Sequence, residues 1–269
     1  MSTHKDKVDA IIQLEPPKNV PTLQTFLGMM TYPSSYIPFY AWIAAPLFTL
    51  LKKGKEWLWS NNEQKAFELC KQALASAPVM AYPIINTSFR LYSDACDYGI
   101  AAILQQVQPI SIRDLKGTKA YEKLEKAYKD NLPIPDLVIP VGPKPDKTDN
   151  MAGGASTGTW AKIFKDTVVK VEQVIAYWSR ILKPAERNYS PTEREALALK
   201  EGLIKFQPYL EGTEFHAITD HAALTWSKTF QSVNRRLLSW GTVFAAYPGM
   251  KIIHRAGRVH SNVDPISRL

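Results

Sequence analysis

The sequence predicts an α/β protein with one mixed sheet and helices packed on it, preceded by a small helical segment. Three observations predict this fold. Apolar residues recur at helical spacing in residues 1–82. After them, short strand-like runs alternate with helical runs, which is typical of α/β proteins. The 269 residues are also enough to bury a core in one large domain or two modest ones.

The helical segment contains two amphipathic runs. In "PTLQTFLGMMTY" the residues Leu23, Phe26 and Leu27 share one face. We expect this helix to break or end at Pro33, because a proline in a helix interior costs ~3 kcal/mol or more. The second run is "NNEQKAFELCKQALASAP", and its expected apolar face comprises Ala66, Leu69 and Leu74.

Two strands and an insertion follow. "FRLYSDACDYGIAAILQQ" (89–106) predicts a strand that stops at Asp94, a turn that contains Asp97, and a second strand. Residues 107–170 are rich in Pro, Gly, Lys and Asp with little periodicity. We expect a flexible insertion there, carrying one charged helix around Lys119–Lys129 and hanging off the edge of the sheet.

Regular strands and helices are predicted again after the insertion. The predicted elements are strand 171–182, helix 190–210, strand 214–220, helix 234–247, strand 250–257 and a last helix that begins near Asn262. The expected domains are therefore a helical segment over 1–82 and an α/β domain over 83–269, interrupted by the insertion at about 107–170.

Composition narrows the class of protein. A net charge of +8 and a pI near 9.3 suit a polyanionic partner such as nucleic acid, although a merely soluble basic protein has the same composition. Two cysteines without a CxxC motif predict neither structural zinc nor a disulfide framework. No apolar signal or membrane-length stretch is visible, so we expect an intracellular protein without membrane contact, in cytoplasm or nucleus.

Acidic residues stand where strands end. Asp94 closes the first predicted strand, and Asp220 closes the strand over 214–220. Ligand sites of α/β proteins lie at such edges. Either residue alone is better explained as a cap of the next turn or helix.

The helix over 190–210 holds a further acid of interest. Ser190 and Glu193 fit a capping box, which gives Glu193 a sufficient structural role. Glu195 lies beside the apolar stripe of this helix, and a carboxylate there is costly unless it is paired or holds a metal. A solvated acid at the margin of the stripe is the alternative. The stripe comprises Ala196, Leu199, Leu203 and Phe206.

A fourth acid, Asp264, opens the last predicted helix, where the helix dipole alone would also favour it. Together the four acids can meet at one edge of a sheet, and clustered carboxylates repel unless a cation lies among them. Mg²⁺ or Mn²⁺ suits an all-oxygen site. Two such ions activate water and stabilise the leaving oxygen in phosphodiester cleavage, which predicts a nuclease.

Several stretches resemble a known family. In order they are "YSDACDYGIAAILQQ", "VIAYWSRILKPAERNYSPTEREALAL", "FHAITDHAALTW", "NRRLLSW" and "HRAGRVHSNVDPISRL". They are similar to the ribonuclease H domain of gypsy-type LTR retrotransposon Pol polyproteins. The earlier "TLQTFLGMMTYPSSYIPFYAWIAAPLFTLLKKGKEWLWSNNEQKAFELCKQALASAPVMAYP" resembles the reverse transcriptase thumb and connection. The resemblance implies a ribonuclease H-like mixed five-stranded sheet with flanking helices.

The resemblance also implies a site. The family's metal-binding carboxylates fall on Asp94, Glu195, Asp220 and Asp264, and its assisting histidine falls on His254, for which a local structural hydrogen bond is an equal alternative. The implied function is an endonuclease that cuts the RNA strand of RNA·DNA hybrids with two Mg²⁺ ions, for which Mn²⁺ can substitute. Candidate nucleic-acid-binding residues are Lys228, Arg235 and Arg236, although exposed helix cations are often only solvated.

Three further expectations follow. The Tyr-x-Asp-Asp turn of the polymerase palm is absent from these residues, so we expect no independent polymerase activity. The expected partners are the hybrid and the rest of a Pol polyprotein, with no small-molecule cofactor. The alternative functions are a catalytically inactive, nucleic-acid-binding remnant of a decayed retroelement, and a metal-dependent phosphatase.

Overall fold

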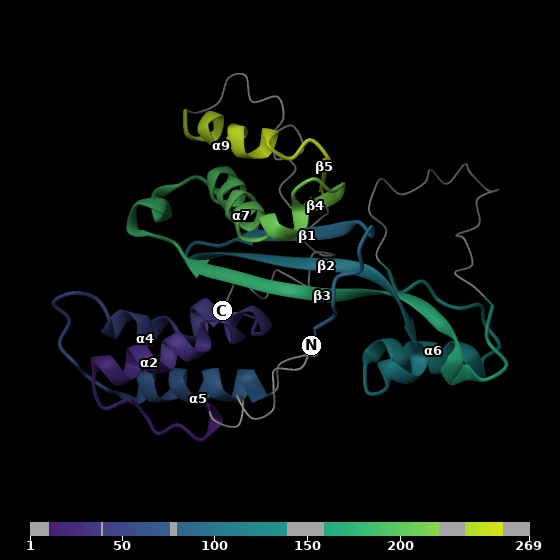
Figure 1. Cartoon of the computed structure of the whole chain (residues 1–269), viewed down its shortest axis with the longest axis horizontal. Helices are drawn as coiled ribbons and strands as arrows, with labels where there is room; N and C mark the ends of the chain where they lie inside the picture. Colours follow the sequence, from purple (N-terminus) through teal and green to yellow (C-terminus); the bar gives the residue numbers. More distant parts are fainter. Residues whose placement is uncertain (1–10, 39, 76–79, 139–158, 221–234, 255–269) are drawn as a thin grey trace.

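A five-stranded mixed sheet forms the centre of the protein (Figure 1). The computed structural model describes residues 11–38, 40–75, 80–138, 159–220 and 235–254. The strands are β1 (Phe89–Ala95), β2 (Gly99–Ser111), β3 (Val168–Ile181), β4 (Phe215–Thr219) and β5 (Met250–His254), in the order β3-β2-β1-β4-β5. β1 pairs antiparallel with β2 and parallel with β4, so the predicted mixed sheet is confirmed.

Helix α7 (Pro191–Lys205) covers one face of the sheet over β1 and β2, and α9 (Arg235–Ala245) packs on α7. A Cβ added at Gly202 would lie 3.0 Å from the Cβ of Ala102, so this glycine lets α7 approach β2 closely. The predicted helix over 190–210 is in fact two helices. It ends at Lys205, and α8 (Gln207–Leu210) follows, because Pro208 lacks the N–H that a continuous helix would use.

The N-terminal helices form a unit with its own core. This helical unit comprises α2 (Val20–Met30), η1 (Pro33–Tyr36), α3 (Tyr40–Ile43), α4 (Ala45–Leu50) and α5 (Asn61–Ala75). Helix α2 ends before Pro33, as predicted. The helical unit lies below the sheet in Figure 1, next to the edge strand β3, which η1 and α3 contact.

The prediction was wrong for one expected core residue of the helical unit. Leu69 was predicted on the apolar face of the second helix, but it is 49% exposed. The buried face of α5 instead consists of Ala66, Phe67, Cys70 and Leu74. At about 100° per residue, Leu69 lies more than 90° from the centre of that face, so the wide face formed with Phe67 and Cys70 leaves it in solvent.

The segment between β2 and β3 forms an arm. β2 continues to Ser111 and β3 begins at Val168, so the chain leaves the strands five residues later than the predicted 107 and rejoins them earlier than predicted. The arm carries η2 (Ile112–Leu115), η3 (Phe164–Asp166) and α6 (Lys119–Lys129), which confirms the predicted charged helix. A separate small apolar cluster holds the arm together.

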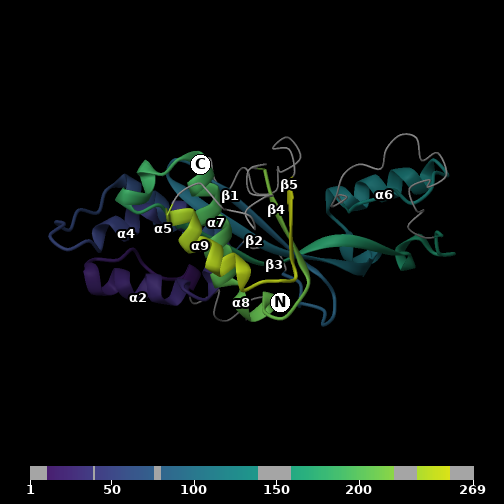
Figure 2. The ribbon, with the colours of Figure 1, turned by 90° about the horizontal axis from the view of Figure 1, so that it is seen from above.

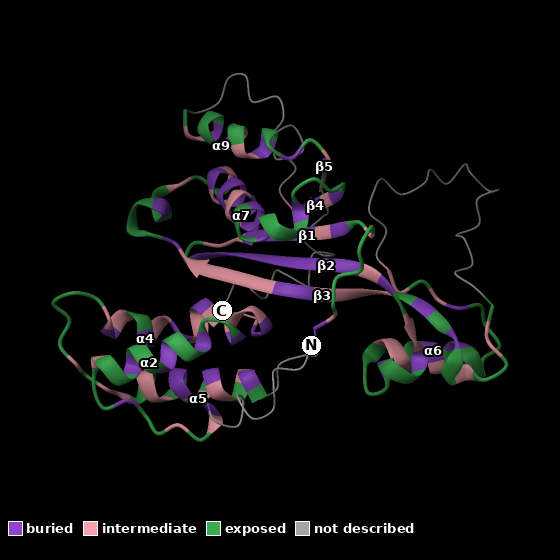
Figure 3. Ribbon diagram, in the orientation of Figure 1, coloured by how far each residue is buried: buried purple, intermediate pink, exposed green. Residues whose placement is uncertain are grey.

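The arm and the helical unit lie at opposite ends of the sheet (Figures 1 and 2). β1 and the first half of β2 are buried, whereas β3 is half-buried along most of its length (Figure 3). Within the described part of the chain, no helix combines the length and the apolar composition needed to cross a membrane. The expected flexibility of the insertion stays a prediction, because residues 139–158 lie outside the described residues.

Candidate metal centre

Asp94 lies near the end of the central strand β1, between β2 and β4. It is paired with Ala101 across the β1–β2 ladder and is only 3% exposed. Side chains alternate along a strand, so Asp94 falls on the same face as Tyr92. Because the strand has neighbours on both sides, the carboxylate is carried on a rigid element.

Glu195 reaches the same place from helix α7. Ser190 caps this helix: its Oγ accepts from the Glu193 amide at 3.3 Å, and the Ser190 amide donates to Glu193 Oε2 at 2.8 Å. The predicted capping box is therefore confirmed. Glu195 is 7% exposed, and its Oε1 accepts a 3.1 Å hydrogen bond from the Ala95 amide. Its Oε2 is buried and accepts no hydrogen bond from any described residue.

Three carboxylates converge. Asp94, Glu195 and Asp220, the residue directly after β4, each offer one oxygen, and these oxygens lie within 4.8 Å of one another. Burial raises the pKa of Glu195 well above its ordinary value, and the charges of Asp94 and Asp220 raise it further. The Ala95 amide and Arg194 oppose this effect without cancelling it.

The donor set fits a hard divalent cation. Only carboxylate oxygens face one another in this cluster, and oxygen is the ligand that Mg²⁺ and Mn²⁺ prefer. The buried Glu195 Oε2 without a donor is the kind of atom that a cation would satisfy. A site for Mg²⁺ therefore explains this cluster better than three acids with separate structural roles do.

Of the other predicted site residues, one lies beside the cluster and two lie outside the described residues. His254 ends β5 beside Thr219, and its Nε2 lies 2.9 Å from the Asp220 carbonyl oxygen. Because a carbonyl oxygen only accepts, Nε2 donates this bond and carries a proton. His254 is exposed. Asp264 and Lys228 lie outside the described residues.

The two arginines of α9 differ in their surroundings. Arg236 forms a 2.5 Å ion pair with Glu193 and lies 3.9 Å from the centre of the Tyr189 ring, which ties α9 to α7. Burial raises the pKa of Glu193, but hydrogen bonds from Ser190 and the Arg236 charge outweigh it and lower the pKa overall. Arg235 is exposed.

Sequence reasoning missed a pair beside the site. Arg194 precedes Glu195 in α7 and forms an ion pair with Asp97 in the turn between β1 and β2. Asp97 had been predicted as a turn residue only. The two residues are 97 positions apart, and no local pattern in the sequence indicates their contact.

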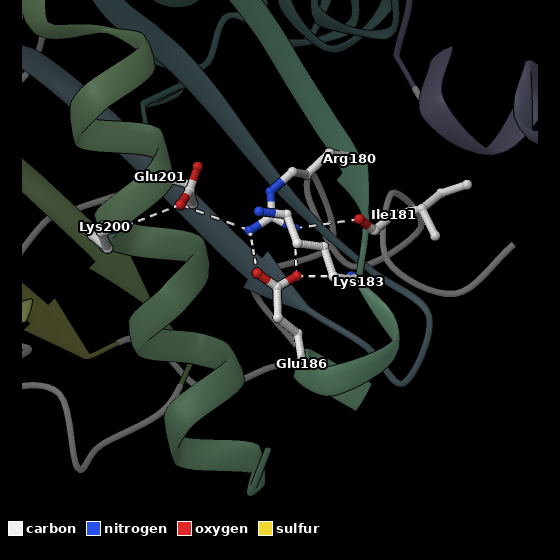
Figure 4. Close-up of polar contacts among 6 residues, drawn as sticks. All are labelled: Arg180, Ile181, Lys183, Glu186, Lys200 and Glu201. Carbon is white, nitrogen blue, oxygen red and sulfur yellow. Dashed lines mark hydrogen bonds and ion pairs between the residues drawn. The ribbon is translucent and has the colours of Figure 1, made fainter. Parts of the chain in front are cut away.

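A second network that the sequence analysis did not predict surrounds Arg180, as Figure 4 shows. Arg180 of β3 donates to both carboxylate oxygens of Glu186, at 2.6 and 3.0 Å. Glu186 lies in η4 (Pro184–Asn188), and Glu201 of α7 lies 3.7 Å from Arg180. Burial raises the pKa of Glu186, but Arg180 and the Lys183 amide lower it overall. The network joins β3, η4 and α7.

Comparison with known proteins gives the family. Two models, both described as the RNase H-like domain found in reverse transcriptase, match residues 59–114 and 148–247, together more than half of the chain. The chain belongs to this family of RNase H-like domains. The first match includes α5 of the helical unit as well as β1 and β2.

The chain is similar in sequence to transposon polyproteins. The Tf2-3 and Tf2-4 transposon polyproteins of Schizosaccharomyces pombe are each 27% identical over 269 residues, which covers 98% of this chain. The predicted resemblance to retrotransposon Pol polyproteins is thereby confirmed. The chain spans 16% of the length of these relatives.

Solved structures share the fold. The foamy viral protease-reverse transcriptase in complex with double-stranded DNA matches with a TM-score of 0.61 and 14% identity, over 93% of this chain and 41% of that one. The same viral protein in complex with an RNA/DNA hybrid matches with a TM-score of 0.61 and 14% identity, over 93% and 27%. The predicted ribonuclease H-like fold is confirmed.

Proposed function

We propose that this chain is a ribonuclease H that hydrolyses the RNA strand of RNA·DNA hybrids with a divalent cation. The observation that carries the proposal is the convergence of Asp94, Glu195 and Asp220 within 4.8 Å in a chain of this family. A foamy viral relative in fold has been solved with an RNA/DNA hybrid, which supports the choice of substrate.

The three carboxylates would hold Mg²⁺ or Mn²⁺, with Asp264 proposed as a fourth ligand. When bound there, such cations would supply an activated water and stabilise the leaving 3′ oxygen. The chain's own residues prepare the site: the Ala95 amide binds one oxygen of Glu195 and so restrains this carboxylate within the cluster. We assign proton transfer or product release to His254, whose Nδ1 is the nitrogen available because Nε2 donates to the Asp220 carbonyl.

Binding of the hybrid is proposed to rest mainly on phosphate contacts. The net charge of +8 supports salt-dependent affinity with little sequence preference, and contacts to 2′-hydroxyls would mark the RNA strand. Arg235 is exposed and suits a phosphate contact, and Lys228 stays a proposed contact. The ion pair of Arg236 with Glu193 favours a structural role for that residue. The remainder of a Pol polyprotein is a proposed partner.

The test is cleavage of a labelled RNA·DNA hybrid by wild type and Asp94→Asn in Mg²⁺. Cleavage of the RNA strand should fall by about 100-fold or more in the variant, because a metal ligand worth several kcal/mol in the transition state is weakened. Asp130→Asn, the same change at an exposed acid next to α6, is the matched control and should cleave like wild type.

Two outcomes would contradict the proposal. Hybrid binding at low salt without cleavage by wild type would favour the inactive binding remnant. Cleavage of small phosphate esters in preference to the hybrid would favour a phosphatase. Duplex RNA and duplex DNA as parallel substrates report whether the RNA·DNA hybrid is preferred.

A further inference from the structure

The turn between β1 and β2, residues 96–98, is held from the side of α7. The Ala95 amide donates to Glu195 Oε1, and Asp97 forms its ion pair with Arg194. The turn is closed by the Cys96 amide, which donates to the Gly99 carbonyl at 2.9 Å. Because Asp94 and Ala95 directly precede this turn, its position determines where two of the three carboxylates lie.

The same turn is held from the other side by the helical unit. Trp42 of α3 packs with Tyr92, Ala101, Ile103 and Ile218, on the sheet face that carries Asp94. Its indole lies against Gly99, where an added Cβ would lie only 2.4 Å from the Trp42 Cζ2 atom. The neighbouring Ala41 amide donates to the Ser179 hydroxyl of β3 at 3.3 Å.

We propose that Trp42 is a positioning residue, through which the helical unit holds the β1–β2 turn and thereby Asp94 and Glu195. The chain of contacts runs from the indole to Gly99, from Gly99 to Cys96, and from the adjoining Ala95 amide to Glu195. The effect on cleavage rests on the proposed function, whereas the effect on the turn does not.

Space at Gly99 is the feature that makes this contact possible. The indole ring occupies the volume that a side chain at position 99 would need, and the Arg180 carbonyl closes the remaining side at 3.0 Å. Any side chain at position 99 must therefore move Trp42, the turn or both.

The first experiment measures hydrogen exchange in the intact chain at the amides of Ala95 and Cys96. In Trp42→Ala these amides should exchange about tenfold faster, relative to amides of β4 as an internal reference. The control is Trp57→Ala, an equal truncation in the helical unit, where Trp57 stacks on Trp59. This control should leave the ratio between the turn and β4 unchanged.

The second experiment is a double-mutant cycle on hybrid cleavage. Gly99→Ala should lower kcat by about tenfold or more with KM within about threefold, because small displacements of catalytic groups cost rate more than binding. In the Trp42→Ala background the same change should lower kcat by only about twofold, since the 2.4 Å clash with the indole is gone and only the 3.0 Å approach to the Arg180 carbonyl remains. Gly28→Ala in α2 meets no atom within 4 Å and should be neutral in both backgrounds.

The outcomes separate this proposal from the proposed function. Unchanged exchange of the Ala95 and Cys96 amides in Trp42→Ala overturns the proposal whether or not the chain cleaves hybrids. Equal effects of Gly99→Ala on kcat in the wild-type and Trp42→Ala backgrounds also overturn it. Faster amide exchange in Trp42→Ala together with an unaltered kcat of that variant does so too. If wild type does not cleave, the proposed function fails alone, and the exchange experiment still decides the role of Trp42.

Discussion

The Ala95 amide of β1 donates a 3.1 Å hydrogen bond to Oε1 of Glu195 on α7. One peptide group of the central strand thus orients a helix carboxylate, and the other oxygen of that carboxylate, Oε2, is buried without a donor from any described residue. On the proposed function, the arrangement favours cation binding at the expense of the stability of the cation-free fold, because a buried charge beside two acids is unfavourable.

Glu195→Gln should therefore stabilise the cation-free protein and abolish cleavage. The raised pKa of Glu195 means that the folded state holds its proton more tightly than the unfolded state. The wild type should consequently lose stability as pH rises through the ordinary pKa of the group toward its folded pKa. At pH 7 in EDTA we expect Glu195→Gln to raise the free energy of unfolding by on the order of 1 kcal/mol.

Urea unfolding of both proteins between pH 4 and pH 8 measures this difference. Added Mg²⁺ should stabilise wild type and have little effect on the variant, since a ligand that binds only the folded state stabilises it. Cleavage by the variant should fall by about 100-fold or more. A difference in stability that is constant across this pH range would contradict the interpretation.

Substitutions of Arg236 and Arg235 should distinguish a structural role from a role in nucleic-acid binding. Arg236→Gln breaks the ion pair with Glu193 and the contact with Tyr189, and should destabilise the protein by about 1 kcal/mol, a modest value because Arg236 is 40% exposed. Because the pKa of Glu193 is lowered in the folded state, the full loss of stability is expected above the ordinary carboxyl pKa. The loss should become smaller as the pH falls through the pKa of Glu193 in the folded state.

Arg235→Gln is the matched change at an exposed neighbour. It should leave the free energy of unfolding unaltered and reduce the slope of log affinity against log salt by about 0.9 for one lost phosphate contact. The measurements are urea unfolding and hybrid binding over a salt series. A reduced salt slope in Arg236→Gln with unaltered stability would instead make Arg236 the phosphate contact.

Two glycines should respond oppositely to alanine. A Cβ at Gly249 would lie 2.6 Å from the Thr213 carbonyl oxygen, where β5 and β4 begin side by side, so Gly249→Ala should cost about 1–3 kcal/mol. Gly241 lies inside α9 with no atom within 4 Å, so Gly241→Ala should stabilise by about 0.5–1 kcal/mol. Thermal unfolding reports both, and a loss at both positions would refute the steric argument.

Much of the site could be predicted because local patterns carry it. Asp94 interrupts an apolar strand, Asp220 ends another, and Glu195 stands beside a buried stripe, so each is visible from period and position alone. Ser190 and Glu193 follow from the capping pattern in the same way. These features depend on neighbours within a few residues, which the sequence displays directly.

Contacts between distant segments could not be predicted. Trp42 against Gly99 and Arg180 with Glu186 depend on where separate elements meet, and the sequence holds no record of those distances. The length of β2 was also missed, because residues 107–170 as a whole are rich in Pro, Gly, Lys and Asp and were therefore assigned to an insertion. Beyond Gln106, however, β2 has β3 as its one strand neighbour, and such an edge position tolerates proline.

The sheet order has a consequence for synthesis. β1 is adjacent to β4 in space, yet Asp94 precedes Asp220 by about 126 residues in the chain. A ribosome adding roughly 5–20 residues each second needs about 6–25 s between them. Through that interval β1 and β2 can form a hairpin, but the partner edge of β1 is empty and the carboxylate cluster does not exist. On the proposed function, the emerging chain would therefore not bind a cation at this site until β4 is made.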